Sequence, residues 1–448
     1  MDNKNTQVEQ AKMTVSPAKT RSFETIGEIS GLIRQHYKRL HEAADRGEPI
    51  AYVMVGYPQE ILRAMKVNCA YTENYAAVCA SKQAALPFLN QSESDGFSRD
   101  LCSYAQAWIG YTSELAKSKD PKTLGAPWGG LPKPSFLLGR GQCEAGYKGY
   151  QCLSRYLDLP MFVYDSKLIE HPTGFDWEDK EVQKRHISYV KGQIQEAVTF
   201  LEKVMGKKIN WDDVSEAIQK HRDARNYWHE IHKLRKNSPC PIGTRDIVTA
   251  MFPLYFMLGT QEAVDMYRKL YYEVKSRADG NIGTIQGEEK YRLMWGGIAQ
   301  WHNLAFFTSL EEAGAVFVID HYYRDAYTEV DASDPLDALA KRHYWEQAKV
   351  IARARNKRFG DVGDGRTGLY LELAQEYGID GVIFHLIKTC RPISVGWINV
   401  YKTLREKLDL PTYLLEGDIV DSRQFDEEQT RRNVASFVEL MASRKEKK

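Results

Sequence analysis

The chain has 448 residues, of which 43% are hydrophobic and 27% charged, and its formal net charge is +1 at pH 7. This composition is typical of a soluble globular protein with two or three domains. The near-neutral charge argues against nucleic acid or an anionic membrane as a partner, and no apolar run reaches the roughly 18 residues of a membrane span.

The N-terminal part of the chain predicts a tail followed by an α/β domain. Residues 1–22 have no apolar h-region and are expected to form a short disordered tail without a secretory signal. From residue 23 onward, a charged helical segment is followed by short apolar runs that alternate with helices, which predicts a doubly wound parallel sheet over residues 23–171. The predicted strands are Ile50–Gly56, Cys69–Tyr71, Ser135–Leu138 and Pro160–Tyr164.

The pattern then changes twice. Residues 172–282 have a 3.6-residue apolar period, which predicts a helical domain, with Asn210 as the cap of one long helix. Strand–helix alternation returns over residues 283–448 and predicts a second α/β domain, closed by a helix at Asp426–Ser443. Its predicted strands are Leu293–Gly297, Ala315–Asp320, Val382–Ile387 and Thr412–Leu415. The expected fold is therefore α/β, with two doubly wound parallel-sheet domains and a helical insert between them.

Cys390 lies just beyond the carboxyl end of the most apolar predicted strand, where open α/β sheets keep their ligands. Cys143 follows another predicted strand after a glycine-rich turn, and Cys102 lies in a predicted helix around Phe97–Ala116. Thiolates at the mouth of a cleft suit iron–sulfur ligation, although the long separations between them match no local cluster motif. The seven cysteines are odd in number and widely spaced, so a disulfide framework is not predicted, and each thiol is a buried apolar group or a metal ligand.

Glu73 follows a predicted strand directly and has two interpretations. A carboxyl group at a strand end can act as a general acid or base when burial raises its pKa. The alternative is an ordinary glutamate in the first turn of a helix, where the helix dipole stabilises its negative charge.

Several other patterns carry less weight. The GxGxxG match at 363–368 follows a helical segment instead of a strand, so it is interpreted as a loop and not as a dinucleotide site. No P-loop motif occurs, and the pair His229 and His232 is interpreted as part of a solvated helix face. An aromatic group near Trp301 is either core or the wall of a flat substrate pocket. Its members are Trp295, Trp301, His302, Phe306 and Phe307.

Taken together, several segments resemble the family of 2-hydroxyacyl-CoA dehydratases and ATP-dependent benzoyl-CoA reductases, over about residues 45–445. The matching segments are AYTEN at 71–75, DLCSYAQAWIG at 100–110, PSFLLGRGQC at 134–143, GEEKYRLMWGGIAQW at 287–301, DGVIFHLIKTC at 380–390 and EGDIVDSRQFDEEQTRRN at 416–433. The resemblance implies a [4Fe-4S] cluster held by Cys102, Cys143 and Cys390, and Glu73 as the acid/base residue. It assigns no ligand role to Cys69, Cys79, Cys152 or Cys240.

Within this family, GTQEAVDMYRKLYYEV at 259–274 and DPLDAL at 334–339 look more like the larger cluster-bearing subunit of benzoyl-CoA reductases, as does the SVGW after Cys390. That likeness implies a cytoplasmic oxidoreductase subunit that reduces benzoyl-CoA to cyclohexa-1,5-diene-1-carbonyl-CoA in the anaerobic degradation of aromatic compounds. The implied partners are a second cluster-bearing large subunit, two smaller iron–sulfur ATPase subunits, ferredoxin and an aromatic acyl-CoA. Two alternatives stay open, a 2-hydroxyacyl-CoA dehydratase subunit and a non-catalytic electron-storage subunit.

Overall fold

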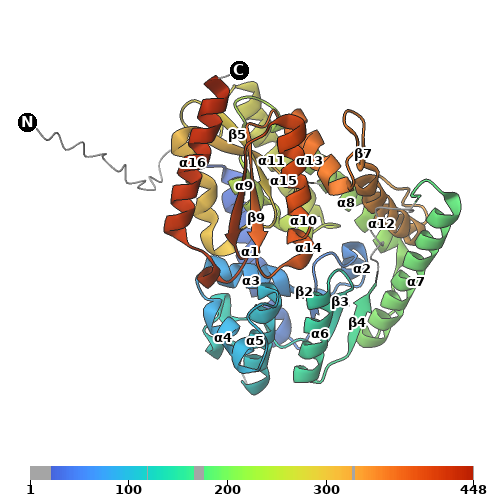
Figure 1. Cartoon of the computed structure of the whole chain (residues 1–448). Helices are drawn as coiled ribbons and strands as arrows, with labels where there is room; N and C mark the ends of the chain where they lie inside the picture. The colour runs from blue at the N-terminus through green and yellow to red at the C-terminus, as the bar shows by residue number, and fades with distance from the viewer. Residues whose placement is uncertain (1–21, 119, 166–175, 325–327, 447–448) are drawn as a thin grey trace, which may run out of the picture.

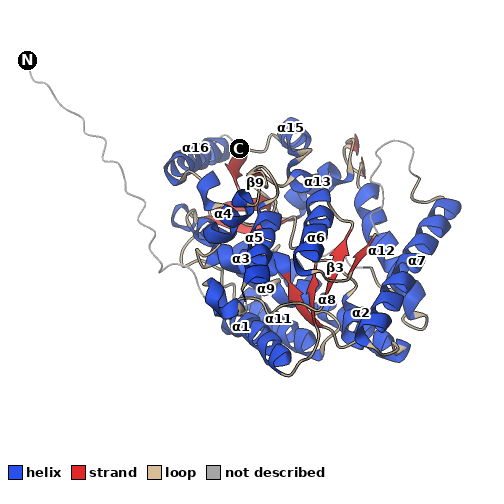
Figure 2. Cartoon of the chain, turned by 90° about the horizontal axis from the view of Figure 1, so that it is seen from below, coloured by secondary structure: helices blue, strands red, loops and turns tan. Residues whose placement is uncertain are grey.

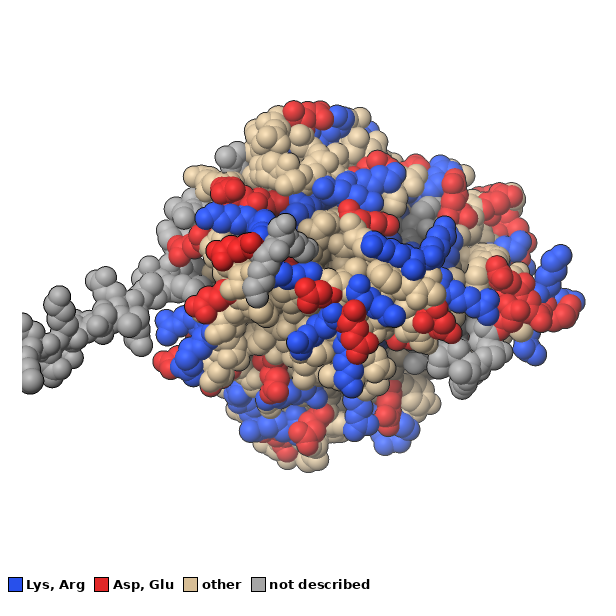
Figure 3. All heavy atoms as spheres, turned by 45° about the horizontal axis from the view of Figure 1, so that its top comes forward, with Lys and Arg blue, Asp and Glu red and all other residues tan. Residues whose placement is uncertain are grey.

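A computed structural model describes residues 22–118, 120–165, 176–324 and 328–446 of the chain (Figure 1). The predicted disordered tail, residues 1–22, therefore lies outside the described residues except for Ser22. Among the described helices, none is both long and apolar enough to cross a lipid bilayer. On the face drawn in Figure 3, basic and acidic side chains are interspersed, in keeping with the net charge of +1.

Two four-stranded sheets, all parallel, form the centres of the two α/β halves, as the strand–helix alternation predicted. The first sheet has the order β2–β1–β3–β4 and the second has the order β10–β9–β5–β6. The strands of the first are β1 (Ile50–Val53), β2 (Asn68–Tyr71), β3 (Phe136–Arg140) and β4 (Met161–Tyr164). Those of the second are β5 (Tyr291–Gly296), β6 (Ala315–Asp320), β9 (Gly381–Ile387) and β10 (Thr412–Gly417).

The two sheets have the same strand order when the strands of each are numbered in chain order. In the first sheet, the chain starts at β1, adds β2 on one side and then β3 and β4 on the other. In the second sheet, it starts at β5, adds β6 on one side and then β9 and β10 on the other. Numbered in chain order within its own sheet, each therefore has its first strand between its second and third strands. The strand order reverses between the first and third strands of each sheet. At such a switch point, open α/β sheets form a crevice at the carboxyl ends of their strands.

A small antiparallel hairpin, which the sequence analysis did not predict, lies apart from both sheets. It consists of β7 (Arg355–Asn356) and β8 (Gly360–Asp361).

Helices surround the strands in both halves (Figure 2). In the first half they are α1 (Glu24–Asp45), α2 (Gln59–Ala64), α3 (Thr72–Ser81), α4 (Leu86–Ser94), α5 (Ser103–Lys117) and α6 (Glu144–Leu157). In the second half they are α12 (Pro335–Ala352), α13 (Gly365–Glu376), α14 (Arg391–Ser394), α15 (Trp397–Leu408) and α16 (Glu427–Glu446). The described 3-10 helices are η1 (Pro121–Leu124), η2 (Pro127–Gly129), η3 (Trp301–Thr308), η4 (Glu311–Ala313) and η5 (Ser422–Gln424).

The segment predicted as a helical insert contains helices and no strand among its described residues. They are α7 (Lys180–Met205), α8 (Trp211–Leu234), α9 (Thr244–Ala250), α10 (Phe252–Phe256) and α11 (Gln261–Asp279). Asn210 caps α8 as predicted, because its side chain accepts a hydrogen bond from the Asp212 backbone at 3.0 Å. Helix α8 packs against α2 of the first half, and α7 packs against α12 of the second. The inserted helices thus contact both halves, and the main hydrophobic core includes residues from all three parts.

Three local predictions were wrong. Cys102 does not lie within a helix: it precedes Ser103, the first residue of α5. The GxGxxG segment is a loop only at its start, because Asp364 accepts the Thr367 N–H at 2.9 Å and so begins α13 inside the motif. His232 is buried and its ring contacts Trp228 edge-on, so it is not part of a solvated helix face.

Candidate functional site

The four side chains singled out from the sequence line a single cavity between the two halves. They are Glu73, Cys102, Cys143 and Cys390. Cys143 follows β3 and Cys390 follows β9, so these two thiols lie beyond the third strand of their respective sheets. The related topology brings both switch points to the cavity and explains why residues so far apart in sequence converge there.

A hydrogen-bond chain fixes the segment of Cys102 beside that of Cys390. The backbone N–H of Ser103 donates to the Thr389 hydroxyl at 3.1 Å, and the Thr389 hydroxyl donates to the Asp418 carboxylate at 2.5 Å. All three of these residues are buried. The chain connects the start of α5 in the first half to the end of β9 in the second, so the relative position of the two thiols depends on the seam between the halves.

Each of the three thiols lies at the start of a helix. Cys102 immediately precedes α5, Cys143 precedes α6 and Cys390 precedes the short helix α14. The backbone N–H of Gly146, three residues after Cys143, donates to the Cys143 sulfur at 3.3 Å. The unpaired N–H groups at a helix start favour a thiolate over a thiol.

Burial opposes that effect. It raises the pKa of the Cys390 thiol to about 11. The backbone N–H of Ile393, three residues after Cys390 in the chain, lowers this pKa only in part. Burial raises the pKa of Cys102 further, with a contribution from the neighbouring Cys390, while the Ala105 N–H lowers it. A positively charged metal centre would therefore be needed to hold these sulfurs as thiolates.

The donor set fits an iron–sulfur cluster. Three soft thiols face one cavity, and each has a backbone N–H three residues ahead that favours the thiolate. In the described residues, no three His, Cys, Asp or Glu side chains are placed to hold a single metal ion. A cubane is bound differently, because each thiolate binds a different iron atom and the sulfurs need not converge on one point.

Glu73 combines both of its predicted interpretations. It lies in the first turn of α3, yet its carboxyl group is buried and lines the cavity. Burial raises the pKa of Glu73 to about 7, against the opposing effect of hydrogen bonds to the carboxylate. Those bonds come from the Val55 backbone N–H at 3.3 Å and from the Thr72 hydroxyl at 3.2 Å. The group is thus poised to exchange a proton near neutral pH.

Comparison with known proteins adds the family. The model of the family described as 2-hydroxyglutaryl-CoA dehydratase, D-component, matches residues 54–441, which is most of the chain. The chain belongs to this family. The family resemblance inferred from the sequence segments is therefore confirmed.

Three relatives align with this chain over nearly its full length. The alpha subunit of (R)-2-hydroxyisocaproyl-CoA dehydratase from Clostridioides difficile is 27% identical over 93% of this chain and 96% of its own. The alpha subunit of (R)-phenyllactyl-CoA dehydratase from Clostridium sporogenes is 26% identical over 90% and 92%. A benzoyl-CoA reductase subunit from Thauera aromatica is 24% identical over 92% and 93%. The predicted reductase branch stays a prediction, since the two dehydratase subunits are slightly more similar.

Sequence reasoning missed Tyr322, which lines the same cavity as Glu73 and the three cysteines. Burial raises its pKa above the usual range, with further contributions from Cys390, Glu73 and Cys143, which line the same cavity. Tyr322 comes two residues after the end of β6, as Glu73 comes two residues after the end of β2. Strands β2 and β6 are each the second strand of their sheet in chain order. The equivalent position, two residues beyond the strand, is therefore the sequence signal that could have pointed to Tyr322.

Aromatic side chains make up much of the remaining wall. They are Tyr104, Trp108, Tyr255, Phe256, Trp301 and Tyr323. The aromatic group predicted around Trp301 is divided by the fold: Trp301 faces the cavity, whereas Trp295 is fully buried against Phe307 and Phe317. The Trp301 indole N–H donates to the Tyr104 hydroxyl, which joins the walls contributed by the two halves.

The other cysteines lie outside this site. Cys69, Cys79 and Cys240 are buried, and Cys152 is half-buried on α6. None of these four lines the cavity. Burial raises the pKa of Cys240 to about 11 and that of Cys79 to about 12, so both remain protonated apolar groups at neutral pH.

Proposed function

We propose that this chain is the iron–sulfur catalytic subunit of an ATP-dependent benzoyl-CoA reductase, which converts benzoyl-CoA to cyclohexa-1,5-diene-1-carbonyl-CoA. The observation that carries the proposal is the cavity, in which three thiols and a carboxyl group of raised pKa face aromatic walls. Aromatic walls would pack against a flat aromatic acyl group. The alignment with the benzoyl-CoA reductase of Thauera aromatica and the reductase-like segments at 259–274 and 334–339 support the same interpretation.

Cys102, Cys143 and Cys390 would hold a [4Fe-4S] cluster at this cavity. When bound, the cluster would supply single electrons at low potential. Glu73, protonated on a large fraction of molecules near pH 7, would donate a proton from its carboxyl group to the ring as negative charge develops there. The mostly apolar walls would exclude water, which would otherwise compete as a proton source.

Tyr322 supplies a second hydrogen-bond donor. Its raised pKa keeps the phenol protonated at any physiological pH, and it lines the cavity beside Glu73. In this proposal the hydroxyl donates to the thioester carbonyl oxygen, where negative charge gathers as the acyl group is reduced. Tyr322 and Glu73 would then act on opposite ends of the same conjugated system.

The proposed partners are a second, related large subunit, two smaller iron–sulfur ATPase subunits and ferredoxin. Support for a related large subunit comes from the beta subunit of (R)-phenyllactyl-CoA dehydratase of Clostridium sporogenes, which is 26% identical over 56% of this chain. Nucleotide hydrolysis on separate subunits agrees with a sequence that has no P-loop motif.

A second candidate is the elimination of water from a 2-hydroxyacyl-CoA. The specific observation in its favour is the identity of 27% and 26% to two dehydratase alpha subunits, against 24% to the reductase subunit. The same cavity would serve both reactions, because both need a proton-transfer group and a thioester-binding site beside the thiols.

An anaerobic assay of the purified complex separates the candidates. Benzoyl-CoA and 2-hydroxyacyl-CoAs are supplied with reduced ferredoxin and ATP, and ferredoxin oxidation is measured against product. Ring reduction that consumes ferredoxin in proportion to product supports the reductase. Dehydration that continues after a single priming electron identifies the dehydratase instead, and failure with both substrates contradicts a catalytic role.

Replacement of the cysteines tests the cluster. We expect Cys102→Ser, Cys143→Ser and Cys390→Ser each to lose iron, acid-labile sulfide and the broad absorption near 400 nm (roughly where such clusters absorb), because each removes one thiolate. Cys69→Ser and Cys240→Ser are the matched controls, since both thiols are buried outside the cavity, and they should retain iron. Equal iron content in all five variants would disprove the ligand assignment.

A further inference from the structure

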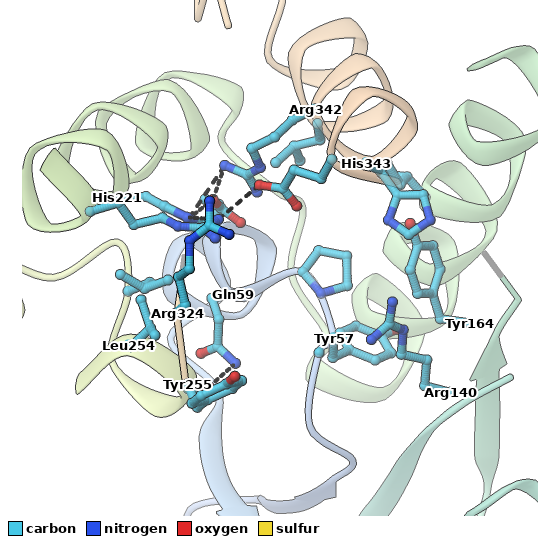
Figure 4. Close-up of a pocket in the computed structure, with 18 residues that line it drawn as sticks. Tyr57, Gln59, Arg140, Tyr164, His221, Leu254, Tyr255, Arg324, Arg342 and His343 are labelled. Atoms are coloured by element: carbon cyan, nitrogen blue, oxygen red, sulfur yellow. Dashed lines mark hydrogen bonds and ion pairs between the residues drawn. The ribbon is translucent and has the colours of Figure 1, made fainter. Parts of the chain in front are cut away.

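A second cavity adjoins the thiol cavity. It lies at the carboxyl ends of β1, β3 and β4 of the first sheet, and helices α8 and α12 contribute to its wall (Figure 4). Tyr255 lines both cavities. Arg140, on the wall of the second cavity, donates to the side-chain oxygen of Gln142, on the wall of the first, at 3.1 Å. A ligand with two ends could therefore occupy both.

The second cavity carries an excess of positive charge. Its lining contains four arginines and only two carboxylates. The arginines are Arg140, Arg225, Arg324 and Arg342, and the carboxylates are Glu60 and Glu346. Arg342 pairs with Glu60 at 2.6 Å and Arg225 pairs with Glu346 at 2.8 Å, so both carboxylates are already neutralised.

The Glu60 pair is a structural element of the wall. Although burial opposes ionisation, Arg342 and His221 hold the pKa of Glu60 well below its usual range, so the carboxylate stays charged. Burial and the neighbouring Arg342 lower the pKa of His221 to about 4, which leaves that imidazole neutral at physiological pH. Arg342 is therefore committed to Glu60 and unavailable as a free cation.

Arg140 and Arg324 differ from Arg225 and Arg342, because no ion pair joins either guanidinium to a carboxylate within the described parts of the chain. Figure 4 shows Arg140 and Arg324 reaching toward the cavity from opposite sides. Burial lowers the pKa of both groups and outweighs the opposing effect of surrounding carboxylates, such as Glu346 for Arg140 and Glu376 for Arg324.

Two further donors in this cavity are unused. The Nε of Arg140 and the hydroxyl of Tyr57 are both buried and have no hydrogen-bond partner among the described residues. The Tyr57 side chain lines the cavity and is only 1% exposed. Buried donors of this kind are normally satisfied, so a ligand that accepts hydrogen bonds is the expected occupant.

The backbone is shaped to admit Arg140. Gly56 follows β1 with a φ of +83°, and a Cβ at this position would lie 2.0 Å from Nη1 of Arg140. The glycine thus leaves the space that the guanidinium occupies. The turn after β1 therefore accommodates the Arg140 guanidinium at the edge of the cavity.

We propose that this second cavity binds the phosphate groups of coenzyme A, with Arg140 and Arg324 as the phosphate-binding residues, while the thioester end reaches the thiol cavity. The inference rests on the proposed function, which supplies an acyl-CoA substrate. Phosphate fits the observations because it carries several acceptor oxygens and more than one negative charge, and guanidinium groups bind it in a bidentate manner.

Isothermal titration calorimetry of the full-length chain with coenzyme A, pantetheine and ATP tests the proposal. We expect Arg140→Gln and Arg324→Gln each to raise the Kd for coenzyme A about tenfold or more, because each removes a charge-assisted hydrogen bond to phosphate. Pantetheine, which lacks the phosphates, should bind all variants equally. Arg432→Gln is the matched control, as Arg432 lies on the exposed face of α16.

Three outcomes would overturn the proposal: unchanged affinity for coenzyme A in both arginine variants, an equal loss of pantetheine affinity, or ATP binding as tight as that of coenzyme A, which would mark a nucleotide site. Arg324→Lys keeps the positive charge and should retain part of the affinity. It therefore distinguishes the loss of a phosphate contact from misfolding of the glutamine variant. Binding of coenzyme A requires neither turnover nor a cluster, so this experiment is independent of the activity assay. If the affinity for coenzyme A depends on the arginines but the complex turns over no substrate, the proposed function is disproved and the phosphate site is retained.

Discussion

At the scale of single residues, Glu73 is the group whose chemistry the cavity changes most. Burial brings its pKa to about 7 from 4.5, so the carboxyl group is largely protonated below pH 7 and largely ionised above it. If the protonated form donates to the substrate, the rate of turnover should fall as the pH rises through about 7. This direction is opposite to that of a carboxylate acting as a general base.

Glu73→Gln tests this role. We expect turnover to fall by about 10²-fold or more, because a general acid is lost, and the fall of the rate above pH 7 should disappear while the iron content is retained. Glu114→Gln, at a partly exposed position paired with Lys117, is the control. A Glu73→Gln variant with normal turnover and an intact cluster would favour the electron-storage role instead.

Tyr322 gives a second test at this scale. Tyr322→Phe removes one hydroxyl and keeps the ring that forms the cavity wall, so its stability should be close to that of the wild type. We expect kcat/KM to fall about tenfold, as for the loss of one hydrogen bond to developing charge. The exposed Tyr272→Phe should have no effect. A thermal unfolding midpoint lowered as strongly as the activity would assign Tyr322 a structural role.

At the scale of elements, the start of α6 depends on close packing at Gly146. A Cβ there would lie 2.2 Å from the terminal methyl of Met54 and 3.3 Å from the Cys143 sulfur. Gly146→Ala should therefore displace the Met54 side chain and crowd the Cys143 sulfur, with a cost of about 1–3 kcal/mol and a lower iron content per chain. Gly192→Ala, in α7, is the matched control because nothing lies within 4 Å of its added methyl group, and it should be neutral or slightly stabilising. Normal iron content in Gly146→Ala would show that α6 tolerates the shift.

Local sequence predicted these elements well where one physical signal dominated. Unbroken apolar runs predicted β9 and β6, because strands covered on both faces carry few polar side chains. Helix starts were harder: cysteine is not a usual capping residue, so the local sequence does not mark Cys102 as the residue that precedes α5. The burial of His232 was also hidden, since Tyr377, whose hydroxyl donates to the His232 carbonyl, is distant in sequence.

At the scale of the whole molecule, the candidate ligands come from both α/β halves, with Cys102 and Cys143 in the first and Cys390 in the second. Anaerobic removal of iron with a chelator should therefore loosen the seam more than either sheet, because metal binding stabilises the folded state that assembles its ligands. Hydrogen exchange should increase around the starts of α5 and α14 and much less in β1 and β5. Uniform exchange across the chain would contradict a cluster shared between the halves.

The sequence by itself determined the α/β class, the positions of the eight sheet strands and the chemical types that surround the cavity, because apolar periodicity and residue chemistry are local properties. Only the tertiary structure decided that Cys102, Cys143, Cys390 and Glu73 line one cavity, and that Tyr322 joins them. The reason is that parallel strands pair through long crossovers, so the order of strands in each sheet, and hence which loops meet, depends on packing between segments that no local pattern reports.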